Sequence, residues 1–382
     1  MNRKLAICLA GITSLSLLYC AGAQAQSVKL YGVVDTGIEY INHANPAGDS
    51  LARMPITTGE LPSRFGVTGV EDLGDGYKAV FTLENGLAVA TGAANQGGRL
   101  FGRQAFVGLD GPLGALTLGR QYSMMTWAMQ PADFVGPSIY GLTSIDPWIA
   151  NARIDNTVSY RKKFGGFSTG GTYSFGRDAS GGTASNSPGQ GNCAGEIPGN
   201  AQACREWSVA LQYDAANWGV STAYDHQNGG PGAAANLFNG IAPLSLANGG
   251  NTDSHLMFDA YTKYDKFLVS AIWLHRLVGS AAPATPNVTS DQYALEVGYA
   301  MTPALRFDGM VQRVINQQED TRATMEVARA TYYLSARTAV YAQFGFLQNS
   351  DNAAYSVSNG GSVTPAKGMS QIASMIGIRE SF

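Results

Sequence analysis

The sequence predicts an all-β protein, a transmembrane antiparallel β-barrel of about 16 strands. Three observations predict it: apolar and polar residues alternate with a period of two, short turns alternate with long polar loops, and aromatic residues gather at predicted strand ends. Charged residues make up only 14% of the chain, below the roughly 25% of soluble domains. A barrel explains a low charge without high hydropathy, because outward and inward residues average along each strand.

The alternation is clear in the first predicted strand, residues 28–40. Leu30 and Ile38 share an apolar face, and Asp35 and Glu39 lie on the opposite, polar face. Period-two patterning of this kind indicates half-buried strands. It recurs to the end of the chain, for example in residues 254–264, 292–299 and 340–346.

The connections between the predicted strands are of two kinds. Seven short turns separate long loops rich in Gly and Asn, and together with eight such loops they imply about 16 strands. The short turns are Asp72–Gly76, Gly111–Gly114, Lys162–Gly166, Ala215–Asn217, Asp265–Lys266, Met301–Pro303 and Leu334–Arg337. The long loops are residues 42–61, 88–102, 121–152, 176–205, 228–253, 277–289, 316–323 and 349–367.

Aromatic residues at the predicted strand ends suit the interfacial girdles of a membrane barrel. After Ala25, no apolar run approaches the roughly 20 residues of a spanning helix, so a membrane protein of this sequence crosses as a closed barrel. A soluble exported β-protein is the alternative on patterning alone. The aromatic residues concerned are Tyr40, Tyr77, Trp207, Trp218, Tyr264, Tyr299 and Tyr333.

Residues 1–25 are predicted to be a cleaved signal peptide. Arg3 and Lys4 precede a mostly apolar stretch, and Ala23 to Ala25 supplies the small residues of a cleavage site. Cys20 offers a lipoprotein alternative, but Tyr19 stands where a small residue is needed. Residues 26–382 then form one domain. Without Arg3 and Lys4, 23 basic and 28 acidic side chains leave a net charge of −5, which does not suggest a nucleic-acid partner.

Cys193 and Cys204 are the two cysteines that remain after the signal peptide. Export to an oxidising compartment and their short spacing favour a disulfide, and two unpaired loop thiols are the alternative.

Five segments carry a resemblance to a known family. They resemble the general trimeric porins of Gram-negative bacteria, especially the betaproteobacterial type, and the resemblance covers essentially the whole mature chain. Glu380 departs from the family's usual ending, where an apolar or basic residue is commoner. The segments are Val28–Asp35, Ser63–Gly74, Leu116–Gln121, Arg153–Tyr160 and Ile376–Phe382.

The resemblance implies a third loop, here residues 121–152, that folds inward and narrows the channel. Acidic residues on this loop then face basic residues on the wall, so that a transverse field acts on polar solutes. By motif position the loop acids are Asp133 and, more weakly, Asp146, and the wall arginines are Arg64, Arg120 and Arg153.

Each of these residues also has a structural interpretation. Strand parity places Arg64 in the lumen but Arg120 outward, unless a bulge or a subunit contact intervenes. Arg153 can instead pair with Asp155 near the strand end, and Asp133 can be an ordinary turn residue. Asp146 can hold the loop together.

The resemblance further implies a homotrimer in the outer membrane, in contact with lipid and lipopolysaccharide, and inserted by the barrel-assembly machinery, which reads the terminal Phe382. The expected function is passive diffusion of small hydrophilic solutes and ions, with weak anion preference or none and no cofactor or metal. The alternatives are a substrate-selective channel of the same fold and a structural or adhesive barrel plugged by its loops.

No enzyme is expected. The four histidines, His43, His226, His255 and His275, are not accompanied by a nucleophile elbow, a metalloprotease helix, a phosphate-binding loop or metal-ligand spacing. A barrel phospholipase with a Ser–His pair is the enzymatic alternative.

Overall fold

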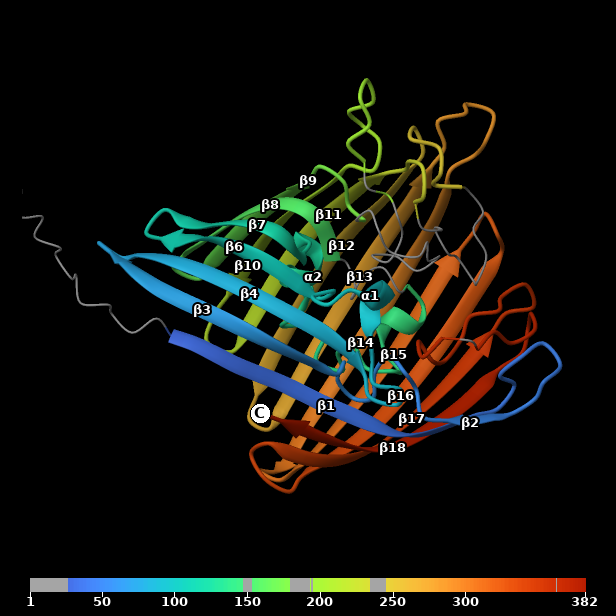
Figure 1. Ribbon diagram of the computed structural model, residues 1–382. Helices are drawn as coiled ribbons and strands as arrows, with labels where there is room; N and C mark the ends of the chain where they lie inside the picture. The colour runs from blue at the N-terminus through green and yellow to red at the C-terminus, as the bar shows by residue number, and fades with distance from the viewer. Residues whose placement is uncertain (1–26, 147–152, 179–192, 194, 234–244, 362) are drawn as a thin grey trace, which may run out of the picture.

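The computed structural model describes residues 27–146, 153–178, 193, 195–233, 245–361 and 363–382. The described part forms a closed antiparallel barrel, as Figure 1 shows. Its wall has 16 strands, and this confirms the predicted fold class. Two shorter strands, β2 and β5, accompany the wall.

The wall strands are β1 (Ser27–Ile41), β3 (Arg64–Gly74), β4 (Tyr77–Ala88), β6 (Gln104–Gly111), β7 (Gly114–Tyr122), β8 (Arg153–Phe164), β9 (Phe167–Ser174), β10 (Glu206–Asp214), β11 (Trp218–Asn228), β12 (Thr252–Tyr264), β13 (Phe267–Gly279), β14 (Val288–Thr302), β15 (Leu305–Asn316), β16 (Thr321–Tyr333), β17 (Thr338–Asn349) and β18 (Gln371–Ser381). The shorter elements are β2 (Leu51–Arg53), β5 (Ala93–Ala94), α1 (Asn95–Gly98), α2 (Met124–Met129) and the 3-10 helix η1 (Leu142–Ser144).

The barrel closes between its first and last strands. Residues 27–33 of β1 pair with β3, and residues 33–41 pair with β18, so β1 changes partner near Val33. Every pairing in the wall is antiparallel, as short hairpin turns between consecutive strands require.

Side chains alternate between an apolar outer face and a polar inner face. Leu30 and Ile38 are each 61% exposed, whereas Asp35 is 3% and Glu39 is 0% exposed. Large apolar side chains cover the outside of the other strands too, with tyrosine and tryptophan among them. Apolar side chains on the outside and carboxylates on the inside match a wall that faces lipid.

One irregularity interrupts the alternation in β7. The pairing register with β8 shifts between Gly119 and Gln121, and Gly119 has a φ of +127°. Leu116 and Leu118 face outward, but Arg120, which shares their parity, is only 7% exposed. A β-bulge at Gly119 therefore turns the Arg120 side chain inward.

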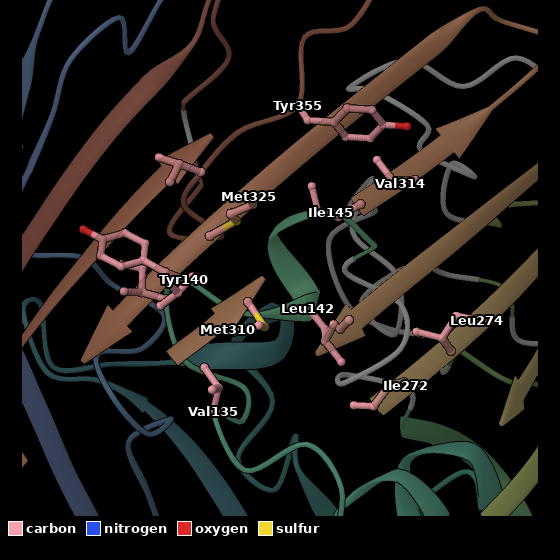
Figure 2. Close-up of a cluster of buried hydrophobic side chains, with 14 of the residues drawn as sticks. Val135, Tyr140, Leu142, Ile145, Ile272, Leu274, Met310, Val314, Met325 and Tyr355 are labelled. Atoms are coloured by element: carbon pink, nitrogen blue, oxygen red, sulfur yellow. The ribbon is translucent and has the colours of Figure 1, made fainter. Parts of the chain in front are cut away.

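The interior holds an apolar cluster on one side of the lumen. Figure 2 shows Val135, Tyr140, Leu142 and Ile145 from the segment after β7 packed among side chains of the wall strands. Ile272, Leu274, Met310, Val314 and Met325 are the labelled wall residues of this cluster.

Residues between β17 and β18 contact the same segment. Asn359 donates from its side chain to the Thr143 hydroxyl at 2.6 Å, and its backbone N–H donates to the Ile139 carbonyl at 3.1 Å. The interior is consequently filled on one side by two loops, and the open space lies toward β3–β8.

Cys193 and Cys204 form a disulfide in the connection between β9 and β10. At the other end of the chain, the Phe382 N–H donates to the Gly32 carbonyl at 3.1 Å, and the Gly32 N–H donates to the Phe382 carbonyl at 2.9 Å. The last residue is thus held by the strand that begins the wall.

Candidate pore constriction

The connection between β7 and β8, residues 123–152, is here called the third loop, and its described part is residues 123–146. It starts with α2, which the Ser123 hydroxyl caps by accepting from the Thr126 N–H at 3.5 Å. The Met124 N–H donates to the Ser208 hydroxyl on β10 at 2.9 Å, and the Ser221 hydroxyl on β11 donates to the Ala128 carbonyl at 3.2 Å. Side chains on the inner face of the wall therefore hold the backbone of α2 inside the barrel.

The tip of the third loop is bound by two charged residues on the inner wall. The Glu296 carboxylate on β14 accepts from the N–H groups of Phe134 and Val135, both at 2.9 Å. The Arg329 guanidinium on β16 donates to the Val135 carbonyl at 2.9 Å and to the Phe134 carbonyl at 3.3 Å. The charge of Arg329 makes its backbone hydrogen bonds stronger than neutral ones.

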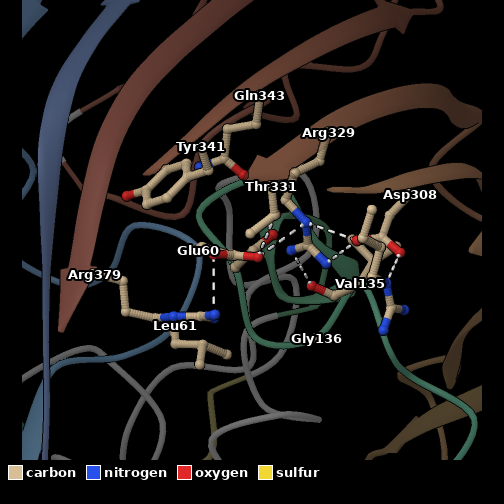
Figure 3. Close-up of polar contacts among 12 residues, drawn as sticks. Glu60, Leu61, Val135, Gly136, Asp308, Arg329, Thr331, Tyr341, Gln343 and Arg379 are labelled. Carbon is tan, nitrogen blue, oxygen red and sulfur yellow. Dashed lines mark hydrogen bonds and ion pairs between the residues drawn. The ribbon is translucent and has the colours of Figure 1, made fainter. Parts of the chain in front are cut away.

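Arg329 is itself held by carboxylates, as Figure 3 shows. Its Nη2 lies 2.8 Å from Oδ2 of Asp308, and its Nε lies 3.6 Å from Oε1 of Glu60. Glu60 also pairs with Arg379 at 3.1 Å and accepts from the Thr331 hydroxyl at 2.7 Å. This network fixes the loop tip to β14–β16 and β18.

The carboxyl-terminal end of the described loop has a second anchor. Oδ2 of Asp146 lies 2.9 Å from Nε2 of His255 on β12 and 3.5 Å from Nη1 of Arg276 on β13. Arg276 also pairs with Asp253 at 2.6 Å. In the structure Asp146 ties the loop to the wall, and the rest of the loop, residues 147–152, lies outside the described residues.

Three arginines lie on the wall opposite the loop tip. Arg103 makes an ion pair with Glu84 at 2.7 Å, and Arg64 lies 3.6 Å from the same carboxylate. Arg103 also donates to the Tyr122 hydroxyl at 2.7 Å, and Arg153 donates to it at 3.2 Å. The Arg153 guanidinium stacks over the Tyr122 ring at 4.9 Å.

A cavity of about 370 Å³ separates these arginines from the loop. Arg64, Arg103, Arg153 and Glu84 line it on the wall side, and Asp133 lines it on the loop side. The structure therefore brings together three of the residues singled out in the sequence: Arg64, Arg153 and Asp133.

Arg120 does not line this cavity. Its Nη1 lies 2.6 Å from Oδ1 of Asp155, and its Nε donates to the Gly102 carbonyl at 2.7 Å. Asp155, suggested by the sequence as a partner of Arg153, is a partner of Arg120 and lies 3.7 Å from Arg99.

Asp133 is only 8% exposed despite lining the cavity. One oxygen accepts from the Gly136 N–H at 3.0 Å, and the carboxyl group also interacts with Glu296. Burial raises the pKa of Asp133 above its usual range, so that this acid holds its proton more tightly than an exposed aspartate. The arginines consequently dominate the charge around the cavity.

Sequence reasoning missed Arg103. It has the parity of Val107 and Leu109, which face outward at 58% and 52% exposure, yet it is only 6% exposed. Arg103 directly precedes β6, where the chain has not yet taken up the alternation of the strand. The available signal was a basic residue next to a strand boundary. Parity alone misses this residue, because it places the Arg103 side chain on the outer face.

The described residues contain no group of three or more His, Cys, Asp or Glu side chains suited to a metal ion. Within the same ranges, no helix is both long and apolar enough to span a membrane.

A closed wall with an apolar exterior, a charged lumen and a loop bound inside it defines a class, the channel-forming β-barrels of membranes. The Gram-negative porin family profile matches residues 11–352, and the chain belongs to this family.

Among curated proteins, an outer membrane porin protein of Bordetella pertussis is 36% identical over 52% of this chain and 57% of its own length. Outer membrane porin protein 32 of Delftia acidovorans is 35% identical over 45% of this chain and 51% of its own length. These alignments span about half the length of the curated relatives. Together with the closed barrel, the relatives indicate an outer-membrane protein.

Solved structures show the same fold. The anion-selective porin from Comamonas acidovorans superposes with a TM-score of 0.76 and 23% identity, covering 94% of this chain and 100% of that one. The outer membrane protein OmpT of Vibrio cholerae gives a TM-score of 0.63 and 15% identity, covering 95% of this chain and 99% of that one.

Proposed function

We propose that this protein is an outer-membrane porin through which small hydrophilic solutes and ions diffuse passively, with a preference for anions. The observation that carries the proposal is the cavity beside the third loop, which three arginines line on one side and a buried, readily protonated aspartate lines on the other. Family and fold indicate a channel rather than an enzyme.

Anion preference follows from the local balance of charge. Arg64, Arg103 and Arg153 outnumber Glu84 and Asp133 around the cavity. Salt screens charges beyond about 8–10 Å, so groups that line the narrow part act on a passing ion more than the net charge of the chain does. The name of the Comamonas protein, an anion-selective porin of the same fold, is consistent with this preference.

The predicted site residues take different parts in this proposal. Arg64 and Arg153, joined by Arg103, form the cationic side of the constriction, and Asp133 is the loop acid facing them. Arg120 and Asp146 act indirectly, since Arg120 fixes the wall through Asp155 and Asp146 anchors the third loop. All of these guanidinium groups stay charged at ordinary pH.

We further propose that three copies assemble into a homotrimer. A trimer form is named for one Vibrio cholerae structure of this fold. The outer face of the barrel would then be shared between neighbouring copies and membrane lipid, including lipopolysaccharide. The barrel-assembly machinery is the expected partner of the strand that ends at Phe382.

A loop-plugged barrel is the second candidate function. The observation that favours it is the contact of Asn359 with the third loop, because two loops then fill the same side of the lumen. A substrate-selective channel of the same fold is the remaining alternative, and it differs from the general pore only in what the lumen binds.

The test is single-channel recording of the protein, extracted from outer membranes, in a planar bilayer under a potassium chloride gradient. We expect ohmic steps and a reversal potential that shows anion preference. Arg64→Gln should lower the anion-to-cation permeability ratio about threefold, since two charges some 5–7 Å apart in water interact by about 0.6–0.8 kcal/mol. Arg322→Gln is the matched control, because Arg322 is exposed and pairs with Asp320 at the loop end of β16.

No conductance from a correctly folded barrel would overturn the proposed pore and favour the plugged barrel. Conductance with cation preference would leave the pore but refute the role of the three arginines.

A further inference from the structure

A second cavity continues from the constriction toward the short-turn end of the barrel. It has a volume of about 220 Å³ and lies between α2 and the inner face of β6–β8. Gln104, Tyr122 and Gln130 line both cavities, so the two spaces are contiguous. Arg161, three residues before the end of β8, lies at this second cavity.

The guanidinium of Arg161 makes no ion pair or hydrogen bond with any residue in the ranges that the structure describes. Asp110 on β6 acts on it electrostatically but does not come within ion-pair distance. Arg64 and Arg103, in contrast, share Glu84, and Arg120 is bound by Asp155. Arg161 is therefore a lumen cation whose donors remain available.

Two more residues that line the same cavity carry a side-chain donor without a partner among the described residues. The donors are the indole N–H of Trp127, on α2, and the side-chain amide of Gln130, which follows that helix. Gln121, another lining residue, is different, because its amide nitrogen donates to the Gly119 carbonyl at 3.3 Å and to the Thr157 carbonyl at 3.4 Å. Three unpartnered donors around one small cavity suit an anionic oxygen group.

Aromatic rings form much of the remaining lining. Phe106 projects from β6, Trp127 from α2 and Tyr122 from the end of β7. A cavity of 150 Å³ lined by apolar side chains accepts benzene in another protein. A space of about 220 Å³ is thus large enough for one six-membered ring carrying a small charged group.

The cavity is held open by fixed neighbours. A side chain at Gly170, opposite Arg161 on β9, would come within 2.5 Å of the Met124 sulfur and 2.9 Å of Cγ of Arg161, so glycine leaves room for both. The hydrogen bonds of α2 to Ser208 and Ser221 fix the position of Trp127 relative to the wall. Little reorganisation is needed for a solute to enter a site built in this way.

We propose that this second cavity is a binding site for aromatic monocarboxylates, entered after the constriction by a solute moving toward the short-turn side. The carboxylate accepts from Arg161, the Trp127 indole and Gln130, while the ring lies among Phe106, Trp127 and Tyr122. The inference rests on the proposed pore and adds the class of solute that the pore binds.

The experiment measures block of chloride current in planar bilayers, with sodium benzoate and sodium acetate as the probes. Benzoate should block at a concentration at least about tenfold lower than acetate. Benzoate added to the short-turn side should be more effective than benzoate added to the loop side. Arg161→Gln should raise the half-blocking concentration of benzoate about tenfold, because the charge-assisted hydrogen bond to the carboxylate is lost.

Two variants of Trp127 distinguish the contribution of its aromatic ring to benzoate binding from that of its indole N–H. Trp127→Leu should remove the preference for benzoate over acetate, and Trp127→Phe should keep most of it. Lys162→Gln is the matched control, since it removes one positive charge next to Arg161 on the same strand while Lys162 does not line the cavity. An unchanged circular dichroism spectrum of each variant shows that the barrel is intact.

The outcomes distinguish the two proposals. A protein that conducts no chloride refutes the pore. A conducting protein that benzoate and acetate block equally, or in which Arg161→Gln acts no more than Lys162→Gln, refutes this site and leaves the pore standing.

Discussion

The two sides of the constriction use the same residue types for different purposes. On β14–β16, Glu296 and Arg329 bind the backbone of the third loop. Glu296 accepts from backbone N–H groups, and Arg329 binds backbone carbonyls and the Asp308 carboxylate. On β3–β8, Arg64, Arg103 and Arg153 border open space. The first side builds a rigid obstacle, and the second side gives the remaining opening its charge. Whether a charged side chain binds the third loop decides whether it serves structure or selectivity.

Removing the contacts that fix the third loop to β14–β16 should have the largest effect on stability and on the channel current. Arg329→Leu leaves Asp308 and Glu60 as buried carboxylates and removes two bonds to the loop tip. Loss of one partner from a buried ion pair costs about 3–5 kcal/mol. We expect the free energy of unfolding in urea to fall by that amount and single-channel currents to become noisier. Unchanged stability and quiet currents would show that the loop does not depend on Arg329.

On the arginine side, a substitution can strengthen the anion preference instead of removing it. Glu84→Gln removes the carboxylate that Arg64 and Arg103 share, while the amide oxygen can still accept from Arg103 and the amide nitrogen can donate to the Tyr31 hydroxyl. The anion-to-cation permeability ratio should rise about threefold, the opposite of Arg64→Gln, because one nearby negative charge is lost. A reversal potential measured under a salt gradient checks the sign, and a fall in the ratio would contradict it.

Lowering the pH should increase the difference in charge between the loop side and the arginine side of the constriction. Because burial raises the pKa of Asp133, this acid is neutral over a wider pH range than an exposed aspartate with a pKa of about 3.9. Its raised pKa favours the folded state below the ordinary aspartate pKa, and this contribution is lost as the pH rises through the folded value.

Anion preference should therefore decrease about twofold as the pH rises and Asp133 becomes charged. Reversal potentials recorded between pH 4 and pH 9 test this, and Asp133→Asn should flatten the profile. A profile that is equally steep in Asp133→Asn would assign the pH dependence to another group.

Arg120 should give the smallest effect on selectivity. It lies away from the cavity and is neutralised by Asp155, so Arg120→Gln should change the permeability ratio by less than about 1.5-fold. The same substitution should lower the unfolding free energy, because Asp155 loses its 2.6 Å contact with Arg120. A selectivity change as large as that of Arg64→Gln would place Arg120 among the pore-lining residues.

The wall was predictable from the sequence because its pattern is local. Alternation, turn spacing and outward aromatics each depend on neighbouring residues, and parity alone places Arg64 on the inner face. Parity fails where the backbone departs from an ideal strand. The bulge at Gly119 reverses Arg120, and the position before β6 turns Arg103 inward.

The contacts of the third loop could not be predicted in the same way. Motif position singles out Asp133, but Glu296 and Arg329, which decide its burial and the fixation of the loop, stand more than 160 residues further along the chain. Only the closed barrel brings these strands opposite the loop. The local pattern of either strand does not identify the loop as its partner.

The seam between β1 and β18 constrains how the protein can be made. Val33 pairs with Ser381, and Ile41 pairs with Ala373, so this part of β1 reaches its partner in the closed wall only when β18 is in place. The barrel therefore cannot close strand by strand, starting from β1. Until the final strand arrives, β1 keeps an unpaired edge, which is a hazard for aggregation. A closed wall therefore forms only when β1 and β18 are present together.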